Sequence, residues 1–116
     1  MERWRYLSRL GFNEYQARVL SCLIREDSLS AEEISKETEV PYSKIYSVLN
    51  NLEDIGLIFS NSERPKRYRI DQKDKVIDHA VEKKRKEFIR MKRKARETKK
   101  EIFTMDVREG DSLKDH

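Results

Sequence analysis

The chain has 116 residues, of which 36% are hydrophobic and 41% are charged, and it contains three glycines and two prolines. This length allows one ordinary domain, or a small domain with an extension. Because helix-breaking residues are scarce, the composition favours a mainly helical fold. No apolar run reaches the roughly 18 residues that a membrane span needs, and the N-terminus lacks a signal-peptide pattern. We therefore expect a cytoplasmic protein that has no membrane partner.

Cysteine and histidine, which many catalytic and metal sites use, are almost absent, and the many carboxylates lie beside Lys or Arg on predicted helix surfaces. Cys22 is the single cysteine, which excludes an internal disulfide and a cysteine-based zinc site. His79 has no neighbouring His or Cys to complete a metal site. The sequence also lacks a glycine-rich phosphate loop and a nucleophile elbow. We expect a protein that is not an enzyme and that uses no metal and no cofactor.

Charge is unevenly distributed along the chain, although the formal net charge is only +4. Residues 83–100 contain 11 Lys or Arg against two acids, so this segment carries +9 and the rest of the chain −5. Such asymmetry indicates either a polyanionic partner or the solvated exterior of a coiled coil. The pattern does not decide between them, or whether this segment contacts DNA.

The first half of the chain predicts four helices. The first covers about residues 2–9 and ends at Gly11. The second covers about residues 14–26 and begins at the N-cap Asn13. Ser30 and Glu33 form a capping-box pattern at the start of a short third helix over about residues 31–37.

The fourth predicted helix covers residues 42–55, after Pro41, and ends at Gly56. Its apolar residues follow the spacing of one buried helix face, and they are Ile45, Val48, Leu49 and Leu52. Two strand-like runs come next, over residues 57–60 and 66–70, and the polar loop 61–65 between them predicts a β-hairpin.

The remaining chain predicts one long helix over about residues 72–103, followed by a polar tail from residue 106. Apolar residues recur along this helix at alternating steps of three and four, interrupted by Lys84 and Thr98. That spacing is typical of a coiled-coil seam, in either parallel or antiparallel pairing. It predicts a homodimer whose contact residues are Ile77, Val81, Phe88, Met91, Ala95 and Ile102.

The second, third and fourth predicted helices, followed by the β-hairpin, predict a winged helix-turn-helix. The outer face of the fourth helix carries small polar side chains that suit the major groove, and the hairpin carries cations that suit phosphates or the minor groove. The candidate DNA-binding residues are Tyr42, Ser43, Lys44, Tyr46, Ser47, Asn50, Arg64, Lys66, Arg67 and Arg69.

Several segments resemble, in order, the N-terminal domain of archaeal TrmB-like transcriptional regulators. They include LGFNEYQARV at residues 10–19, SAEEI at 30–34, VPYSKIYSVL at 40–49 and RPKRYR at 64–69. The resemblance covers about residues 7–80, and it implies a winged-helix DNA-binding domain with residues 42–55 as recognition helix and 64–69 as wing. Longer members carry a sugar-binding domain, whereas this chain has a charged helix there, so we expect no small-molecule effector.

Together these patterns predict a mainly α fold with a small β-hairpin. Residues 1–71 would form the DNA-binding domain, 72–105 a long basic dimerisation helix and 106–116 a polar tail. The expected function is sequence-specific binding of double-stranded DNA by a homodimeric transcriptional regulator. The alternative is a winged-helix adaptor that binds other proteins within a larger assembly.

Overall fold

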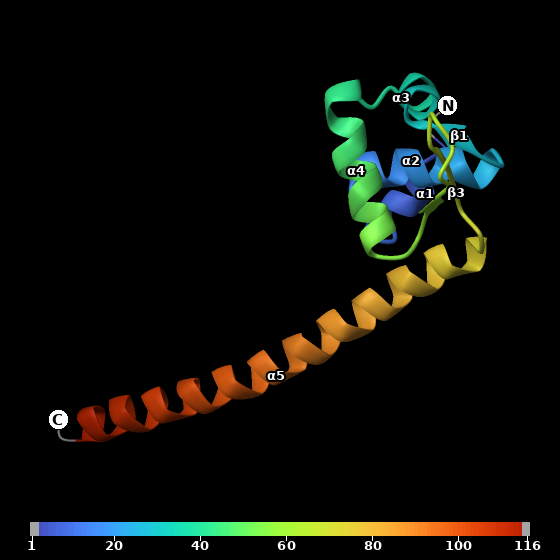
Figure 1. The fold of residues 1–116 in the computed structure, drawn as a ribbon. Helices are drawn as coiled ribbons and strands as arrows, with labels where there is room; N and C mark the ends of the chain where they lie inside the picture. Colours follow the sequence, from blue (N-terminus) through green and yellow to red (C-terminus); the bar gives the residue numbers. More distant parts are fainter. Residues whose placement is uncertain (1–2, 115–116) are drawn as a thin grey trace. The chain divides into compact units, whose positions relative to one another are not determined.

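The computed structural model describes the backbone of residues 3–114 and the side chains of residues 3–105. The chain is mainly helical with a small antiparallel sheet and a long C-terminal helix, as the sequence predicted (Figure 1). It divides into two compact units, Met1–Val81 and Glu82–His116. Among the helices of the described residues, none is long and apolar enough to cross a membrane.

Local capping determines where the first helices begin. Helix α1 covers Arg5–Ser8, a shorter segment than predicted, and α2 covers Glu14–Arg25. The Asn13 side-chain oxygen accepts a hydrogen bond from the Gln16 backbone N–H, and the Gln16 side-chain oxygen accepts one from the Asn13 backbone N–H. Helix α3 covers Ala31–Thr38 and begins with the predicted reciprocal pair of Ser30 and Glu33. Each pair satisfies backbone N–H groups that a helix N-terminus leaves without partners.

Helix α4 covers Tyr42–Asp54. Ile45, Leu49 and Leu52 are fully buried, while Val48 packs at the edge of the core and stays half-buried. Gly56 follows the helix with φ of +79°, the left-handed conformation that glycine adopts without a steric penalty. The predicted amphipathic helix and its glycine end are therefore present.

The sheet has three strands, one more than the predicted hairpin. Strands β2 (Phe59–Ser60) and β3 (Arg67–Arg69) form the hairpin, and β1 (Leu29–Ser30) pairs with the other edge of β3. All pairings are antiparallel, with Tyr68 opposite Leu29 on one side and Ser60 on the other. Tyr68 is buried, so the central strand holds the hairpin to the core.

The core of the first unit lies between α1, α2, α3, α4 and the beginning of α5 (Lys73–Lys114). Val76 and Ala80 of α5 are buried in it, and the His79 ring stacks on Phe12 with centroids 6.2 Å apart. The first turns of the long helix therefore belong to the winged domain, which fixes where that helix starts.

In the second unit α5 continues as a helix to Lys114. The sequence predicted a helix end near residue 103 and a polar tail from 106, and this boundary was wrong. Polar composition alone does not end a helix when no proline follows it. Residues 115–116 and the side chains of residues 106–114 lie outside the described part of the chain.

Candidate nucleic-acid interface

Helix α4 presents one continuous polar face. The buried residues Ile45, Leu49 and Leu52 occupy its inner side, so helical geometry directs the intervening side chains outward. All six side chains predicted on this helix are exposed, and they are Tyr42, Ser43, Lys44, Tyr46, Ser47 and Asn50.

Tyr42 and Tyr46 form a pair at the N-terminal end of this face. Their hydroxyl oxygens are 3.2 Å apart, and their rings meet edge to face with centroids 5.7 Å apart. The hydrogen bond to Tyr46 raises the pKa of Tyr42 above its ordinary value. The two hydroxyl groups can donate or accept hydrogen bonds at this end of the face.

The loop of the hairpin, here called the wing (residues 61–66), is held by Asn61. Its side-chain oxygen accepts hydrogen bonds from the backbone N–H groups of Glu63 and Arg67, at 3.2 and 3.0 Å. Arg64 and Lys66 are exposed, and neither side chain has a hydrogen bond or ion pair within residues 3–105. These two cations are available to an external anion.

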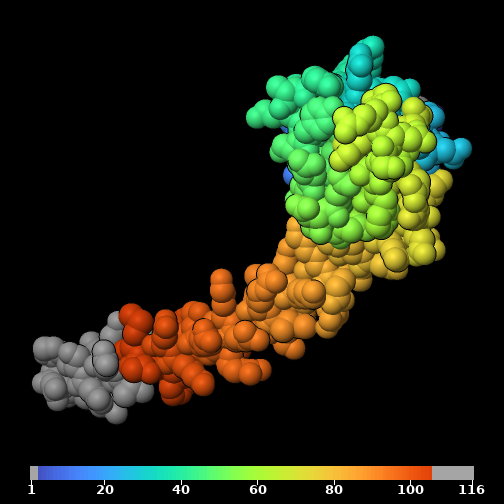
Figure 2. All heavy atoms as spheres, in the orientation of Figure 1, coloured from blue at the N-terminus to red at the C-terminus, as the bar shows by residue number. Residues whose placement is uncertain are grey.

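The wing and α4 face each other across a groove of about 530 Å³. Tyr42 and Tyr46 line it from α4, Arg64 and Lys66 line it from the wing, and Tyr68 contributes from β3. Figure 2 shows the yellow-green atoms of the hairpin beside the green atoms of α4 on one face of this unit. The groove brings Tyr42 and Tyr46 together with Arg64 and Lys66, which lie about twenty positions later in the sequence. Lys44 and Ser47 line a different hollow, beside the start of α2.

Strand β2 of the hairpin also forms a hydrogen bond with α4. The Ser60 hydroxyl of β2 donates a hydrogen bond to the Glu53 carboxylate at 2.8 Å. At the other side of the helix, the Gln16 amide donates to the Asn51 side-chain oxygen at 2.6 Å. No local sequence pattern marks these contacts, because each joins separate elements. They hold the polar face of α4 in a fixed position relative to its neighbours.

A family model described as "Sugar-specific transcriptional regulator TrmB" matches residues 7–73, more than half of the chain. The chain belongs to the TrmB family. The matched residues contain α2, α3, α4 and the whole hairpin, so the family assignment covers the groove and both of its sides.

Two relatives of this TrmB-family chain have known sequences but no described activity. The chain is 35% identical over 81 residues to the uncharacterized protein MJ1623 of Methanocaldococcus jannaschii, covering 69% of the chain and 16% of that protein. It is 38% identical over 53 residues to the uncharacterized protein YrhO of Bacillus subtilis, covering 46% and 19%. The chain thus spans less than a fifth of the length of the curated relatives it matches.

Solved structures show the same fold. TrmBL2, described as an archaeal chromatin protein with a novel mode of DNA binding, matches with a TM-score of 0.64 and 27% identity, over 84% of this chain and 40% of that one. A MarR mutant from E. coli complexed with operator DNA matches with a TM-score of 0.53 and 18% identity, over 70% and 63%. The MarR-family regulator SPO1453 of Silicibacter pomeroyi gives 0.55 and 19%, over 75% and 65%. The latter two likenesses establish the winged-helix fold alone.

Two of the four hairpin cations predicted to contact DNA already have partners within this TrmB domain. The Arg67 guanidinium donates hydrogen bonds to the Ser28 hydroxyl and carbonyl oxygens at 3.0 and 2.8 Å, and it contacts the Glu33 carboxylate at 3.3 Å. Arg69 pairs with Asp71 at 2.6 Å. Residue type alone does not distinguish the four cations. In the structure Arg67 and Arg69 lie on β3 and have internal partners, whereas Arg64 and Lys66 lie in the loop.

The predicted seam residues of α5 are exposed. Within the first unit Ile77 and Val81 face solvent, and within the second Phe88, Met91 and Ile102 are between 51% and 67% exposed, as measured on the single chain. Ala95 is exposed as well, and Lys84 pairs with Glu87 at 3.4 Å. A row of apolar side chains in water is a surface that a partner helix can cover.

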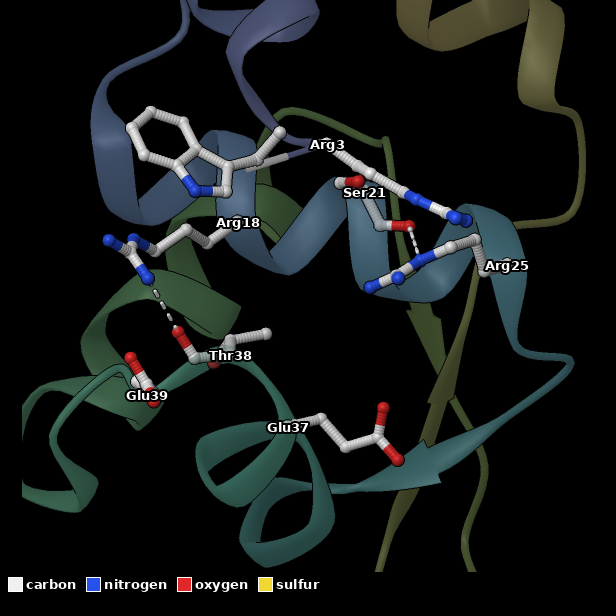
Figure 3. A pocket seen from close by; sticks show the side chains of 8 residues that line it. Arg3, Arg18, Ser21, Arg25, Glu37, Thr38 and Glu39 are labelled. Carbon is white, nitrogen blue, oxygen red and sulfur yellow. Dashed lines mark hydrogen bonds between the residues drawn. The ribbon is translucent and has the colours of Figure 1, made fainter. Parts of the chain in front are cut away.

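A second hollow of about 350 Å³ lies between α2 and the end of α3 (Figure 3). Arg18 donates a hydrogen bond to the Thr38 carbonyl at 3.1 Å while its guanidinium lies 4.8 Å from the centre of the Trp4 ring. Arg25 donates to the Ser21 carbonyl at 3.3 Å. Two of the arginines that line this hollow therefore bind backbone of the TrmB domain itself. Within the described residues no group of three or more His, Cys, Asp or Glu could hold a metal ion.

Proposed function

We propose that this TrmB-family chain is a sequence-specific transcriptional regulator that binds double-stranded DNA as a homodimer and catalyses no reaction. One observation supports this most strongly: the groove beside the wing is lined by Tyr42 and Tyr46 of α4 and by Arg64 and Lys66, two cations that have no partner among the described residues. Two carboxylates, Glu32 and Glu63, line it as well. Membership of a family of transcriptional regulators supports the same conclusion. A MarR protein of the same fold is known in complex with operator DNA.

In this proposal α4 enters the major groove. The helix has 13 residues and so is about 20 Å long, and a B-DNA major groove about 12 Å wide accepts one helix. Asn50 is suited to pair with the edge of adenine, and Lys44 with the edge of guanine. Ser43 and Ser47 are small enough to let the helix approach the bases closely. These residues would determine the sequence preference.

The wing would hold the domain on the DNA without reading sequence. Arg64 and Lys66 are the cations that we assign to phosphates or to the minor groove. Residues 1–82 carry a net charge of −2, so attraction to DNA depends on where these cations lie rather than on overall charge. We assign Arg67 to the stability of the hairpin instead, because its guanidinium is already engaged.

Pairing of two chains through the seam of α5 would give a regulator that recognises a roughly palindromic site. The seam residues Phe88, Met91 and Ile102 repeat at helical coiled-coil spacing and are exposed on the single chain, which supports a self-complementary surface. No small-molecule effector is part of this proposal.

Gel-shift titrations across a salt series test the proposal with the intact chain. The logarithm of the association constant for duplex DNA should fall linearly with the logarithm of the salt concentration. The double variant Arg64→Gln, Lys66→Gln should make this slope shallower by about 1.8 per chain. A chain that binds no duplex at moderate salt, and that stays monomeric until another protein is added, would instead be the adaptor alternative. Sizing of the free protein in the same buffer reports its oligomeric state.

A further inference from the structure

The second unit of the chain has a charge pattern that the proposed function does not use. Residues seven apart on an α-helix lie almost on one line, so the charged positions of α5 can be sorted by face. One face is the seam, which runs through Phe88, Met91, Ala95 and Ile102. A second face, here called the mixed face, carries both cations and acids, and it comprises Lys83, Glu87, Arg90, Lys94, Glu97 and Glu101.

The third face, here called the cationic stripe, contains cations and no acid between residues 83 and 100. Its only other residue in that interval is Ile89. The stripe includes two positions in each of three successive heptads together with one residue between them, and it consists of Arg85, Lys86, Lys92, Arg93, Arg96, Lys99 and Lys100. A solvated coiled-coil exterior needs charge but has no need to segregate it, so this separation requires another explanation.

Most of the stripe is not neutralised by the protein. All seven side chains are exposed. Arg85 is held by Glu82 at 2.6 and 2.9 Å, which raises the pKa of Arg85, and the Lys92 ammonium lies 5.5 Å from the centre of the Phe88 ring. The other five have no side-chain hydrogen bond or ion pair within residues 3–105.

These cations also repel one another. Arg96 lies three or four positions from Lys92, Arg93, Lys99 and Lys100, the spacings at which like charges on a helix destabilise it. An external polyanion would relieve this repulsion, whereas the mixed face has acids of its own. The stripe is therefore the part of α5 that gains most from binding a row of negative charges.

We propose that the cationic stripe is a second DNA-binding surface, which takes the phosphate backbone of duplex DNA without reading its sequence. Residues 85–100 extend about 22 Å along the helix, a length over which B-DNA presents about 13 phosphate charges. The choice of duplex DNA among polyanions rests on the proposed function, because DNA bound by the winged domain is at high local concentration for the rest of the same chain.

Two triple variants of the full-length chain test this proposal, each removing two lysines and one arginine. The stripe variant carries Lys86→Gln, Arg93→Gln and Lys100→Gln, at positions that point away from the seam. The control variant carries Lys83→Gln, Arg90→Gln and Lys94→Gln on the mixed face. Circular dichroism and sizing establish that both remain helical and keep the oligomeric state of the parent, since glutamine is a good helix former.

Affinity for a long mixed-sequence duplex is then measured at several salt concentrations. The plot of log affinity against log salt should be shallower by about 2.7 per chain for the stripe variant. Raising the salt from 50 to 200 mM should therefore increase the Kd of the parent by a factor about 40 times larger, per chain, than it increases the Kd of the variant. The control variant should keep a slope close to the parent's. Equal changes in the two variants would reduce the effect to net charge and overturn the proposal, as would no change in either.

The same proteins with single-stranded RNA and with vesicles containing an anionic phospholipid separate the other polyanions. A difference between the two variants that appears only with RNA or only with vesicles would contradict the assignment to duplex DNA. The Arg64→Gln, Lys66→Gln wing variant separates this proposal from the proposed function. If only the stripe variant loses DNA binding, the role of the wing is wrong and the stripe stands; if only the wing variant does, the reverse holds.

Discussion

Arg67 donates hydrogen bonds to both oxygens of Ser28, the hydroxyl at 3.0 Å and the carbonyl at 2.8 Å, across 39 positions of sequence. Arg67 opens β3 opposite Ser30, whereas Ser28 precedes β1 at the other end of this antiparallel pairing, so the Arg67 side chain extends along β1 to reach it. The same guanidinium reaches the Glu33 carboxylate in the first turn of α3. A cation that looks like a DNA contact in the sequence is thus a link between the hairpin and the helical core.

Replacing Arg67→Gln should destabilise the winged domain by about 1–3 kcal/mol, because hydrogen bonds to a charged group are lost at a half-buried site. The free energy of unfolding from urea titrations followed by circular dichroism measures this. Lys66→Gln is the matched control, since the Lys66 side chain is exposed and unpaired within the described residues. It should leave stability unchanged and weaken DNA binding. If Lys66→Gln lowered stability and Arg67→Gln weakened only DNA binding, the roles that we assign to these two residues would be wrong.

Glu33 predicts a specific pH dependence of stability. The hydrogen bond from the Ser30 backbone N–H, followed by that from the Ser30 hydroxyl and by Arg67, holds the pKa of Glu33 below its ordinary value of 4.5. A carboxyl whose pKa is lowered by folding contributes stability above its unfolded pKa, and that contribution is lost as pH falls through the folded value.

Glu33→Gln should therefore lower the Tm at neutral pH, and the difference from the parent should shrink as the pH falls below about 4. Glutamine keeps an oxygen that can accept the capping hydrogen bond, so the variant isolates the charge. Thermal unfolding monitored at a series of pH values measures the difference. A difference that stays constant down to strongly acidic pH would show that the charge of Glu33 is not involved.

The fold also predicts that Cys22 is chemically inert. Its side chain is fully buried, and burial, with a smaller contribution from Glu37, raises the pKa of the thiol to about 11. The reactive thiolate is then almost absent at neutral pH. Alkylation with iodoacetamide at neutral pH should be far slower in the native protein than in denaturant, where the cysteine should react fully. Equal rates in the two conditions would contradict the described core.

The seam of α5 predicts which exposed apolar residues matter for pairing. Met91→Asp places a charge in the seam and should shift the free protein toward monomer, because an unpaired charge at a coiled-coil contact is costly. Ile89→Asp is the control, since Ile89 is also exposed but lies outside the seam. Sedimentation equilibrium of both variants and the parent measures the shift. If the two variants behave alike, the seam is not the pairing surface.

Local chemistry explains which parts of the fold could be predicted from sequence. Ser30 and Glu33 lie three residues apart and identify the start of α3, and Gly56 identifies the end of α4. The apolar spacing of Ile45, Leu49 and Leu52 predicted the buried side of α4 and therefore its exposed side. These signals lie within one or two turns of helix, so the neighbouring sequence contains all of the information needed.

Long-range contacts explain what could not be predicted. Strand β1 has two residues, too few for a periodic pattern, and it exists because Leu29 pairs with Tyr68 far along the chain. Arg67 could not be distinguished from Arg64 by residue type, since the difference lies in the position of Ser28. The sequence therefore predicted the set of candidate wing residues, and the fold divided that set into exposed and internally bonded cations.

The central claim is that the polar face of α4 reads duplex DNA, and selection of bound duplexes from a random pool tests it most directly. We expect the recovered duplexes to share a recurrent and roughly palindromic sequence. The parent should prefer it over a scrambled duplex, and Asn50→Ala should reduce that preference by about 1–3 kcal/mol. Recovery of no common sequence, or a preference that Asn50→Ala leaves unchanged, would contradict this claim.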